Sequence, residues 1–166
     1  MKPKMRNPQW TNNDSDNTDA AFNRALRYLN LRARTQKEIE EYLLKKQFTP
    51  DAISHAINKL LKLKFLNDEE YGRSFTRGRQ VYKGKSRYYV TYELKQKGVS
   101  EEIIESVMND SQEDLQTAKE FIVRKKRIYG YLEKKEFREK MMRLLAARGF
   151  SFDTIKKALS QEDNRE

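Results

Sequence analysis

The chain has 166 residues, with 35 lysines and arginines against 25 aspartates and glutamates, and a formal net charge of +10 at neutral pH. It has no cysteine and one histidine, which excludes disulfides, thiolate nucleophiles and Cys/His zinc sites and nearly excludes a histidine-based catalytic triad. No apolar run reaches the roughly 18 residues of a membrane span, so we expect a cytoplasmic protein that makes no contact with a membrane.

The first 18 residues are predicted to form a disordered tail. The opening stretch, MKPKMRNPQWTNNDSDNTD, combines prolines and polar side chains with balanced charge, and it has few apolar residues that could pack against a core. Trp10 could be a short docking element, but a stray aromatic side chain in a tail is the simpler interpretation.

After the tail, the pattern is helical almost throughout. Only 6 glycines and 3 prolines interrupt the chain, and no alternating run bounded by turn residues predicts a strand. Thr35 and Glu38 have the spacing of a capping box, which marks the start of a helix. Thr49 before Pro50, and Ser100 before two glutamates, predict two further helix starts.

The strongest pattern is a repeat with a spacing of 51 residues. Apolar residues recur at this spacing in five columns, which are Ile39, Val90 and Met141; Leu43, Leu94 and Leu145; Phe48, Val99 and Phe150; Ile53, Ile104 and Ile155; and Ile57, Met108 and Leu159. The third column is preceded by Gln47, Gly98 or Gly149. Each unit therefore contains a helix, a turn in which glycine suits the left-handed conformation, one apolar plug residue, an N-cap and a second helix.

A leading helix is predicted to complete each unit. Pairs of apolar residues four positions apart mark it in the three copies, namely Ala25 and Leu29, Tyr71 and Phe75, and Ala118 and Ile122. The connection that follows lengthens with each copy. We therefore predict an all-α fold of nine helices in three tandem three-helix repeats, at residues 19–66, 67–110 and 111–162. Because such small units bury little surface alone, we expect them to stack into an elongated, curved array.

The sequence offers little support for catalysis. Gly84-Lys85-Ser86 resembles the end of a P-loop, but the first glycine of that motif would fall on Arg79, so we interpret the stretch as a turn and a helix cap. His55 has no second ligand nearby in the sequence and is interpreted as a surface or boundary residue. The acidic residues at 68–70 suit the start of a helix, and nothing else favours a magnesium site there. We expect a protein that is not an enzyme and has no cofactor or metal.

Positive charge is concentrated in three segments of the chain. Residues 20–66 carry 10 basic and 4 acidic side chains, residues 71–98 carry 8 and 1, and residues 119–148 carry 11 and 4. This excess indicates a polyanionic partner, either nucleic acid or an acidic protein. We predict that the binding surface is formed by Arg32, Arg34, Arg73, Arg77, Arg79, Lys83, Lys85, Arg87, Tyr88, Lys95, Lys97, Arg124, Lys125, Lys126, Arg127 and Arg143.

The segment GKSRYYVTYELKQKGVS, at residues 84–100, shows how core and surface are expected to divide. Val90, Leu94 and Val99 should point inward, and the tyrosines between them can bury their rings while presenting their hydroxyls. The cations expected on the exposed flanks of this helix are Lys85, Arg87, Lys95 and Lys97. The second basic run, at 124–127, also suits the simpler role of cations at the end of a helix.

Four stretches in this order resemble the RecX family of regulatory proteins of the bacterial recombinase RecA. They are RARTQKEI at 32–39, FLNDEEYGRSFTRGR at 65–79, GKSRYYVTYELKQKGVS at 84–100 and LLAARGFSFDTIKKAL at 144–159. The resemblance covers residues 20–160. Two positions depart from the family pattern, because Asn67 stands where an aspartate is frequent and Gln47 where a glycine is usual. Both departures concern caps and turns.

The resemblance implies a non-catalytic protein that binds in the groove of the RecA–DNA filament, spans neighbouring subunits and suppresses ATP hydrolysis, strand exchange and coprotease activity. We also expect the protein to be a monomer. Two alternatives remain on the residues alone. The repeat at 35–68 is similar to a winged-helix DNA reader, and the cations could serve a stand-alone DNA-binding module. The chain could also be a helical adaptor for another acidic protein.

Overall fold

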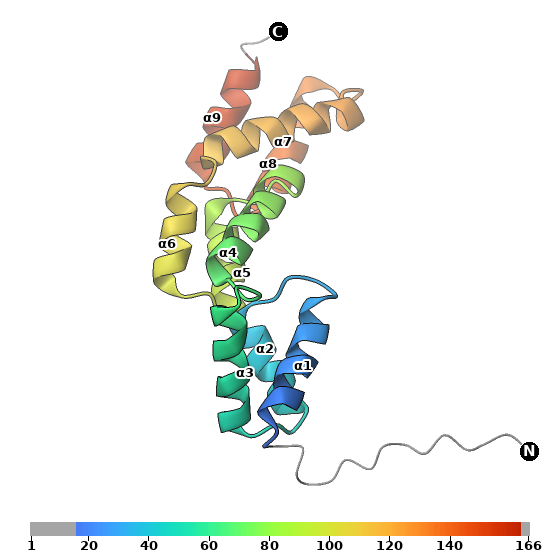
Figure 1. The fold of residues 1–166 in the computed structure, drawn as a ribbon. Coiled ribbons are helices and arrows are strands. Elements are labelled where there is room, and N and C mark those ends of the chain that lie inside the picture. The colour runs from blue at the N-terminus through green and yellow to red at the C-terminus, as the bar shows by residue number, and fades with distance from the viewer. Residues whose placement is uncertain (1–15, 164–166) are drawn as a thin grey trace, which may run out of the picture. The chain divides into compact units, whose positions relative to one another are not determined.

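Nine α-helices and no strand occur in residues 16–163, the part of the chain that the computed structural model describes (Figure 1). Their bounds are α1 (Thr18–Leu29), α2 (Gln36–Lys45), α3 (Pro50–Lys62), α4 (Asp68–Arg77), α5 (Arg87–Gln96), α6 (Glu101–Asn109), α7 (Asp114–Tyr129), α8 (Lys134–Ala146) and α9 (Phe152–Asp163). A short π-helix, η1 (Gly78–Tyr82), follows α4. The all-α prediction is confirmed, and α4 begins where a winged-helix domain would need a hairpin. None of these helices is long and apolar enough to cross a bilayer.

Most of the predicted tail, including Trp10, lies outside the described residues, but Asn17 caps the first helix and Thr18 is its first residue. Asn17 is the N-cap of α1, and its side-chain oxygen accepts a hydrogen bond of 2.9 Å from the backbone N–H of Ala20. This bond satisfies an amide that has no partner within the helix. Helix α1 therefore begins at Thr18, one residue before the predicted start of the first repeat.

The chain divides into two compact units, residues 1–68 and residues 69–166. The first unit contains the first repeat, in which α1 and α2 both pack against α3 (Figure 1). Its core includes Ala25, Ile39, Leu43 and Leu60, which are fully buried. The rings of Tyr28 and Tyr42 stack at the side of this core with their centroids 3.8 Å apart.

The second unit contains the second and third repeats. The core of the second repeat includes Val90, Leu94 and Ile104, and that of the third includes Met141, Leu145 and Ile155. Across both units, every residue of the five apolar columns is buried except Met108, which is half-buried. The repeat spacing read from the sequence thus corresponds to three equivalent cores.

The turn between the second and third helices is the same in all three repeats. Gln47, Gly98 and Gly149 have φ values of 64°, 76° and 84°, in the left-handed region where glycine is favoured. Each is followed by a plug residue whose N–H donates to a carbonyl five residues earlier, at 3.2 Å for Phe48 and Val99 and 3.4 Å for Phe150. This bond satisfies a carbonyl at the helix end, and the plug side chain enters the core.

The extra residues in the second and third repeats lengthen the leading helix rather than the loop after it. Helix α1 has 12 residues, α4 has 10 and is continued by the 5 residues of η1, and α7 has 16. The loops that follow, at 30–35, 83–86 and 130–133, do not grow from copy to copy. The lengthening connection in the sequence is therefore a lengthening helix.

The second and third repeats meet at the turn before α5. The N–H of Ser86 donates to the carbonyl of Arg148 at 3.1 Å, and the Ser86 hydroxyl accepts from the N–H of Tyr89 as the N-cap of α5. Gly84 has φ 61°, and a Cβ there would lie 2.5 Å from the Phe121 ring. The stretch at 84–86 is thus a turn and a helix cap, as predicted, and it also brings α5 against the end of α8.

Candidate interaction surface

The two arginines predicted in the first repeat hold the loop before α2. Arg32 forms an ion pair with Glu38 at 3.0 Å, and Glu38 is the acidic member of the capping box that Thr35 begins. The Arg34 guanidinium lies 3.8 Å from the centroid of the Tyr28 ring and is half-buried. Both side chains therefore stabilise the first unit in this structure.

In the second repeat, Arg73 and Arg79 also form ion pairs with acidic side chains of the same repeat. Arg73 lies 2.9 Å from Glu69 and 2.5 Å from Asp110, and these hydrogen bonds raise the pKa of its guanidinium. The Nε atom of Arg79 lies 2.8 Å from the Glu93 carboxylate. Its guanidinium also lies 4.6 Å from the centroid of the Phe75 ring. These contacts join the leading helix of this repeat to α5 and to the end of α6.

Arg87 does not lie on an exposed flank, so that expectation was wrong. Its guanidinium donates to Ser111 Oγ at 3.1 Å, to the Glu113 carboxylate at 3.0 Å and to the carbonyl of Met108. Its backbone N–H donates to the Asp114 carboxylate at 2.7 Å. Arg87 therefore fastens the start of α5 to the loop between α6 and α7, a contact between residues that the repeat pattern alone does not bring together.

Of the other three cations in this segment, one is exposed to solvent and two pack against aromatic rings. Lys95 is exposed and forms an ion pair with Glu101 at 2.5 Å. Lys85 and Lys97 are half-buried rather than exposed, with Lys85 Nζ 3.5 Å from the centroid of the Tyr89 ring and Lys97 Nζ 5.6 Å from that of Phe75. An ammonium over an aromatic ring is stabilised while part of it remains accessible to solvent.

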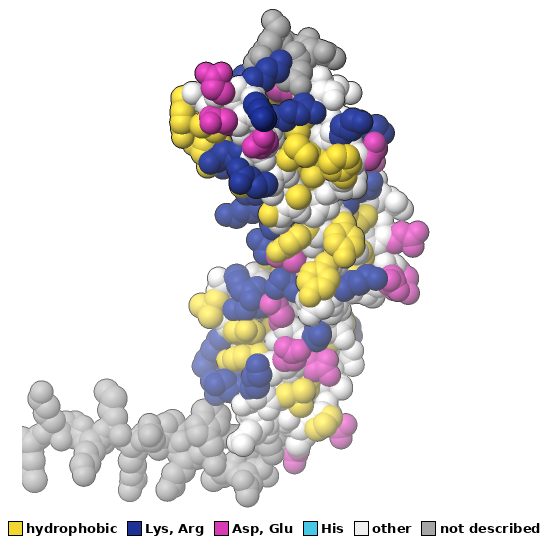
Figure 2. Space-filling view, turned by 180° about the vertical axis from the view of Figure 1, so that it is seen from behind, with side chains coloured by type: hydrophobic (Ala, Val, Ile, Leu, Met, Phe, Trp, Pro, Cys, Tyr) yellow, Lys and Arg dark blue, Asp and Glu magenta, His cyan; other side chains and the backbone are white. Residues whose placement is uncertain are grey.

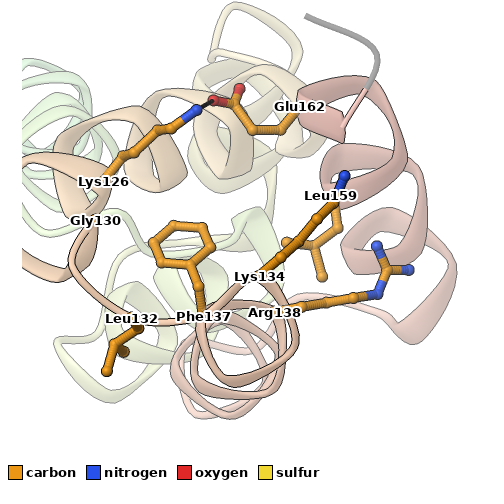
Figure 3. Close-up of a pocket in the computed structure, with 8 residues that line it drawn as sticks. All are labelled: Lys126, Gly130, Leu132, Lys134, Phe137, Arg138, Leu159 and Glu162. Carbon is orange, nitrogen blue, oxygen red and sulfur yellow. Dashed lines mark hydrogen bonds and ion pairs between the residues drawn. The ribbon is translucent and has the colours of Figure 1, made fainter. Parts of the chain in front are cut away.

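The basic run at 124–127 lies on the last turns of α7, beside a cavity of about 210 Å³ in the third repeat (Figure 3). The Phe137 ring points into this cavity, and Lys126 forms an ion pair with Glu162 across one side at 3.3 Å (Figure 3). Lys125 lies 5.5 Å from the centroid of the Phe121 ring. Arg124 is half-buried and Arg127 is exposed.

The side chains of five of the predicted cations form no hydrogen bond, ion pair or ring contact with any residue between 16 and 163. They are Arg77, Lys83, Arg124, Arg127 and Arg143. Figure 2 shows lysines and arginines interspersed with hydrophobic side chains on the face that it draws. Cations without an intramolecular partner keep their full charge available to an anionic partner.

We define the junction surface as Lys83, Lys85 and Tyr88, at the turn and helix start where the second repeat meets the third, together with Arg143 on the last turn of α8, the helix that leads to this join. Tyr88 is 75% exposed, and its ring lies beside Gly149 in the turn after α8. The carbonyl of Lys83 accepts a hydrogen bond of 3.4 Å from Arg148, and Arg143 lies on the last turn of α8. Two lysines and one exposed aromatic ring of the second repeat thus lie at this join, and one exposed arginine lies on the last turn of α8.

Three residues near this surface were not among the predicted site residues. Tyr82 and Tyr92 are 75% and 58% exposed. Arg148 is half-buried, donates to the carbonyl of Leu144 at 2.7 Å and lies 4.3 Å from the centroid of the Phe121 ring, and burial lowers its pKa. The i, i+4 spacing of Tyr88 and Tyr92 in the sequence could have indicated that both share one face of α5.

The described residues hold no cluster of three or more histidines, aspartates or glutamates that could bind a metal ion. His55 is exposed on α3, in agreement with its interpretation as a surface residue. The geometry of this part of the chain is that of a helical surface with cations and tyrosines, and the cation-rich join between the last two repeats is its most distinctive feature.

Three family models match the chain in order. The model of the first three-helix domain of RecX matches residues 21–60, that of the second matches residues 67–108, and that of the third matches residues 112–159. These ranges coincide with the three repeats of the structure.

Relatives and a solved structure agree with these matches. A "Regulatory protein RecX" of Bacillus velezensis is 34% identical over 89% of this chain and 57% of its own length, and one of Bacillus subtilis is 31% identical over 88% and 56%. The chain thus spans just over half the length of these relatives. The crystal structure of RecX from Lactobacillus salivarius superposes with a TM-score of 0.74 and 26% identity, covering 91% of this chain and 98% of that one. With three ordered domain matches over most of its length, this chain belongs to the RecX family.

Proposed function

We propose that this chain is a non-catalytic regulator of a RecA recombinase that binds in the groove of the RecA–DNA filament. In that position it would lower ATP hydrolysis, strand exchange and coprotease activity. The observation that carries the proposal is the membership of all three repeats in a family whose curated members are named regulatory proteins.

The charge distribution supports a polyanionic partner. The chain carries a net charge of +10, and the unpaired cations of the second unit include Lys83 and Arg143 of the junction surface. A filament of recombinase on DNA offers phosphates and acidic side chains in a regular array. Unpaired cations would meet such an array without first breaking an intramolecular ion pair, so their attraction is not reduced by that step.

Repetition supports binding to a repeated partner. Each of the three repeats has its own core and its own basic residues, so several weak contacts can form with successive subunits of a filament. Once one contact has formed, the next is intramolecular, which raises the overall affinity far above that for a single subunit. The elongated, curved stacking expected from the sequence is part of this proposal.

The direct test measures the ATPase activity of purified RecA on single-stranded DNA. Adding this protein at stoichiometric amounts should lower the rate of hydrolysis, and it should do so more strongly on assembled filaments than on RecA kept below the concentration at which filaments form. An unchanged rate on assembled filaments would exclude the proposed regulation.

The role of the junction surface can be tested with a matched pair of variants. Lys83→Glu with Arg143→Glu should weaken inhibition about tenfold or more, because two attractive contacts become repulsive. Lys135→Glu with Lys156→Glu makes the same change in net charge at two other exposed positions of the second unit and should inhibit nearly as well as the parent. Equal loss in both variants would indicate a general charge effect and no role for this surface.

The alternative of a stand-alone DNA-binding module is favoured by the exposed tyrosines, since bases stack on such rings. Titration of naked single-stranded DNA at several salt concentrations distinguishes the two. A module that neutralises Z phosphates should show a log–log slope of about −0.7Z on a single strand. Tight binding without RecA would favour the module, whereas weak binding that becomes tight on RecA filaments would favour the regulator.

A further inference from the structure

A cavity of about 260 Å³ lies within the second repeat, between the end of α4 with η1 and the end of α6. Its walls include Thr76, Arg77, Val81, Val107 and Gln112. The volume is below the roughly 300 Å³ at which pockets for drug-sized ligands begin. The cavity is therefore too small for a nucleotide and suits a single side chain of a partner protein.

Two polar atoms at this cavity are buried without a hydrogen-bond partner. They are the hydroxyl of Thr76, a residue that is 3% exposed, and the side-chain amide nitrogen of Gln112. A threonine in a helix commonly donates to the carbonyl four residues earlier, but that of Thr76 does not. A buried donor without an acceptor destabilises the structure, so these atoms gain most from a ligand that offers acceptors.

The backbone beside the cavity has an unusual conformation. Directly after Thr76 and Arg77 the chain changes from α-helix to the π-helix η1, a rare conformation that is frequent at functional sites. Gln80 of η1 is 2% exposed, and its side-chain amide donates to the carbonyl of Gln112 at 2.9 Å. This bond holds the loop after α6 against η1, with the Gln112 side chain at the cavity.

The charges around the cavity favour a ligand with one negative charge. Three charged residues line the cavity, Arg73, Arg77 and Asp110, so the lining carries a net charge of +1. Arg73 is paired with Asp110 and with Glu69 outside the lining, whereas Arg77 is exposed and forms no ion pair within residues 16–163. The groups without a partner are thus the Arg77 guanidinium and the Gln112 amide nitrogen, which can only donate, and the Thr76 hydroxyl, which can donate. An ionised carboxylate offers two acceptor oxygens with the matching charge.

We propose that this cavity binds the carboxylate of a glutamate side chain presented by a partner protein. The aliphatic part of glutamate would lie between Val81 and Val107, and its carboxylate would accept from Arg77, Thr76 and Gln112. Because the two buried donors are recessed, the half-buried Gln112 side chain has to turn toward the opening as the ligand enters. A phosphate in a nucleic-acid backbone is flanked by sugars on both sides, which makes it a poorer fit than a side-chain carboxylate for donors that are not exposed at the surface. The proposal concerns the chemistry of the site and holds whichever protein supplies the glutamate.

The test uses the full chain labelled with ¹⁵N and titrated with N-acetyl-glutamate-N-methylamide, followed by NMR. We expect saturable shifts of the amides of Thr76, Gly78 and Gln80 and of the Gln112 side chain, with an affinity on the order of millimolar for so small a probe. N-acetyl-glutamine-N-methylamide, which has the same shape without charge, should bind about tenfold or more weakly, because charge-assisted hydrogen bonds are the stronger ones.

Variants separate binding from folding. Thr76→Val and Arg77→Gln should each weaken the probe several-fold, and Lys156→Gln, which removes one positive charge from α9, should leave binding unchanged. Thermal unfolding provides the second readout. Thr76→Val should unfold at the parent temperature or above, because it removes an unsatisfied hydroxyl and keeps the shape of the side chain.

Two results would overturn the proposal. One is the absence of saturable shifts at the cavity, including shifts that scatter over surface cations and vanish in moderate salt. The other is dimethyl phosphate binding at the same amides as tightly as the glutamate probe, which would make the cavity a general anion site.

Discussion

Arg87 shows how a residue that resembles a binding residue in the sequence can be a packing residue in the fold. Its guanidinium reaches three acceptors in the loop between α6 and α7, and its side chain is 28% exposed. A rigid fork of donors suits several fixed acceptors at once, which a lysine cannot match. The positive charge of Arg87 therefore interacts with acceptors of the same chain and is less available to a partner.

Arg87→Ala should lower the free energy of unfolding by about 2 kcal/mol, because hydrogen bonds that involve a charged group contribute roughly 1.5–3 kcal/mol. Arg87→Lys should recover only part of the loss. Chemical denaturation followed by circular dichroism measures both. Lys85→Ala, two residues earlier, is the control and should change stability far less, since the Lys85 ammonium lies over the Tyr89 ring and forms no ion pair within residues 16–163. Equal stability of the Arg87→Ala variant and the parent would show that these contacts contribute nothing.

Asp114 provides a pH-dependent test of the same join. Burial raises the pKa of this carboxyl above its ordinary value of 3.8, and the hydrogen bond from the Arg87 N–H only partly opposes the rise. A carboxyl whose pKa is higher in the folded state holds its proton more tightly there. It therefore favours folding below pH 3.8, and this contribution is lost as the pH rises through its raised folded-state pKa.

Asp114→Asn keeps an acceptor for the Arg87 N–H and removes the titration. We expect the variant to be at least as stable as the parent at pH 7, and the difference to shift in favour of the parent as the pH falls through the raised folded-state pKa of Asp114 toward 3.8. Denaturation curves at pH 7, 5 and 3 measure this trend. A variant whose stability relative to the parent decreases as the pH rises would contradict it.

At the scale of one element, the turn between the second and third helices has a residue with positive φ at the same position in each repeat. Gln47 adopts φ 64° without being glycine, whereas Gly149 adopts φ 84° with the Ser86 hydroxyl close by. A side chain in the left-handed region is strained by contact with its own backbone. The departure of Gln47 from the family pattern therefore has a measurable cost in the first repeat.

Gln47→Gly should raise the free energy of unfolding by about 0.5–1 kcal/mol, because the strain is relieved and the exposed side chain makes no buried contact. Gly98→Ala is the matched opposite change in the second repeat and should lower stability. Thermal unfolding of the three proteins checks the order. An unchanged or lower stability of Gln47→Gly would show that the turn carries no strain.

Gly149→Ala should lower the free energy of unfolding by more than the left-handed backbone conformation alone would cause. A Cβ at this position would lie 2.7 Å from the Ser86 Oγ, which is fixed because it caps α5. Left-handed strain and this clash together should lower the free energy of unfolding by about 2 kcal/mol or more. Hydrogen exchange should become faster at the N–H of Ser86, which donates to the carbonyl of Arg148. Unchanged exchange there would contradict a close join between the last two repeats.

Much of the element-level structure was predictable because it is encoded locally. Thr35 with Glu38, Thr49 with Pro50, and Ser100 cap helices as their sequences indicated, and the apolar columns became three cores. The contacts of Arg79 and Arg87 were not predictable, because they depend on which helices pack against each other. The π-helix after Arg77 leaves no periodic signature in five residues, so the sequence did not predict it.

At the scale of the whole molecule, the distribution of the three cores determines which repeats unfold when one core is disrupted. The core of the first unit consists only of residues between 21 and 66, whereas the second and third repeats lie in one unit and share the join at Ser86 and Arg148. A defect in the core of the second repeat should therefore affect the third repeat as well and spare the first.

Leu94→Asp tests this expectation, because Leu94 is fully buried and an unpaired buried carboxylate costs several kcal/mol, as an order of magnitude. We expect amides between 69 and 163 to lose protection from hydrogen exchange while those of α1 and α3 keep theirs. Circular dichroism should show a partial loss of helix at 25 °C. Leu44→Asp is the control, since Leu44 is 50% exposed on α2 and its replacement should leave protection in both units intact. Protection lost over the whole chain in Leu94→Asp would mean that all three repeats fold as one cooperative body, because a charge in one core can unfold another only through contacts that both need.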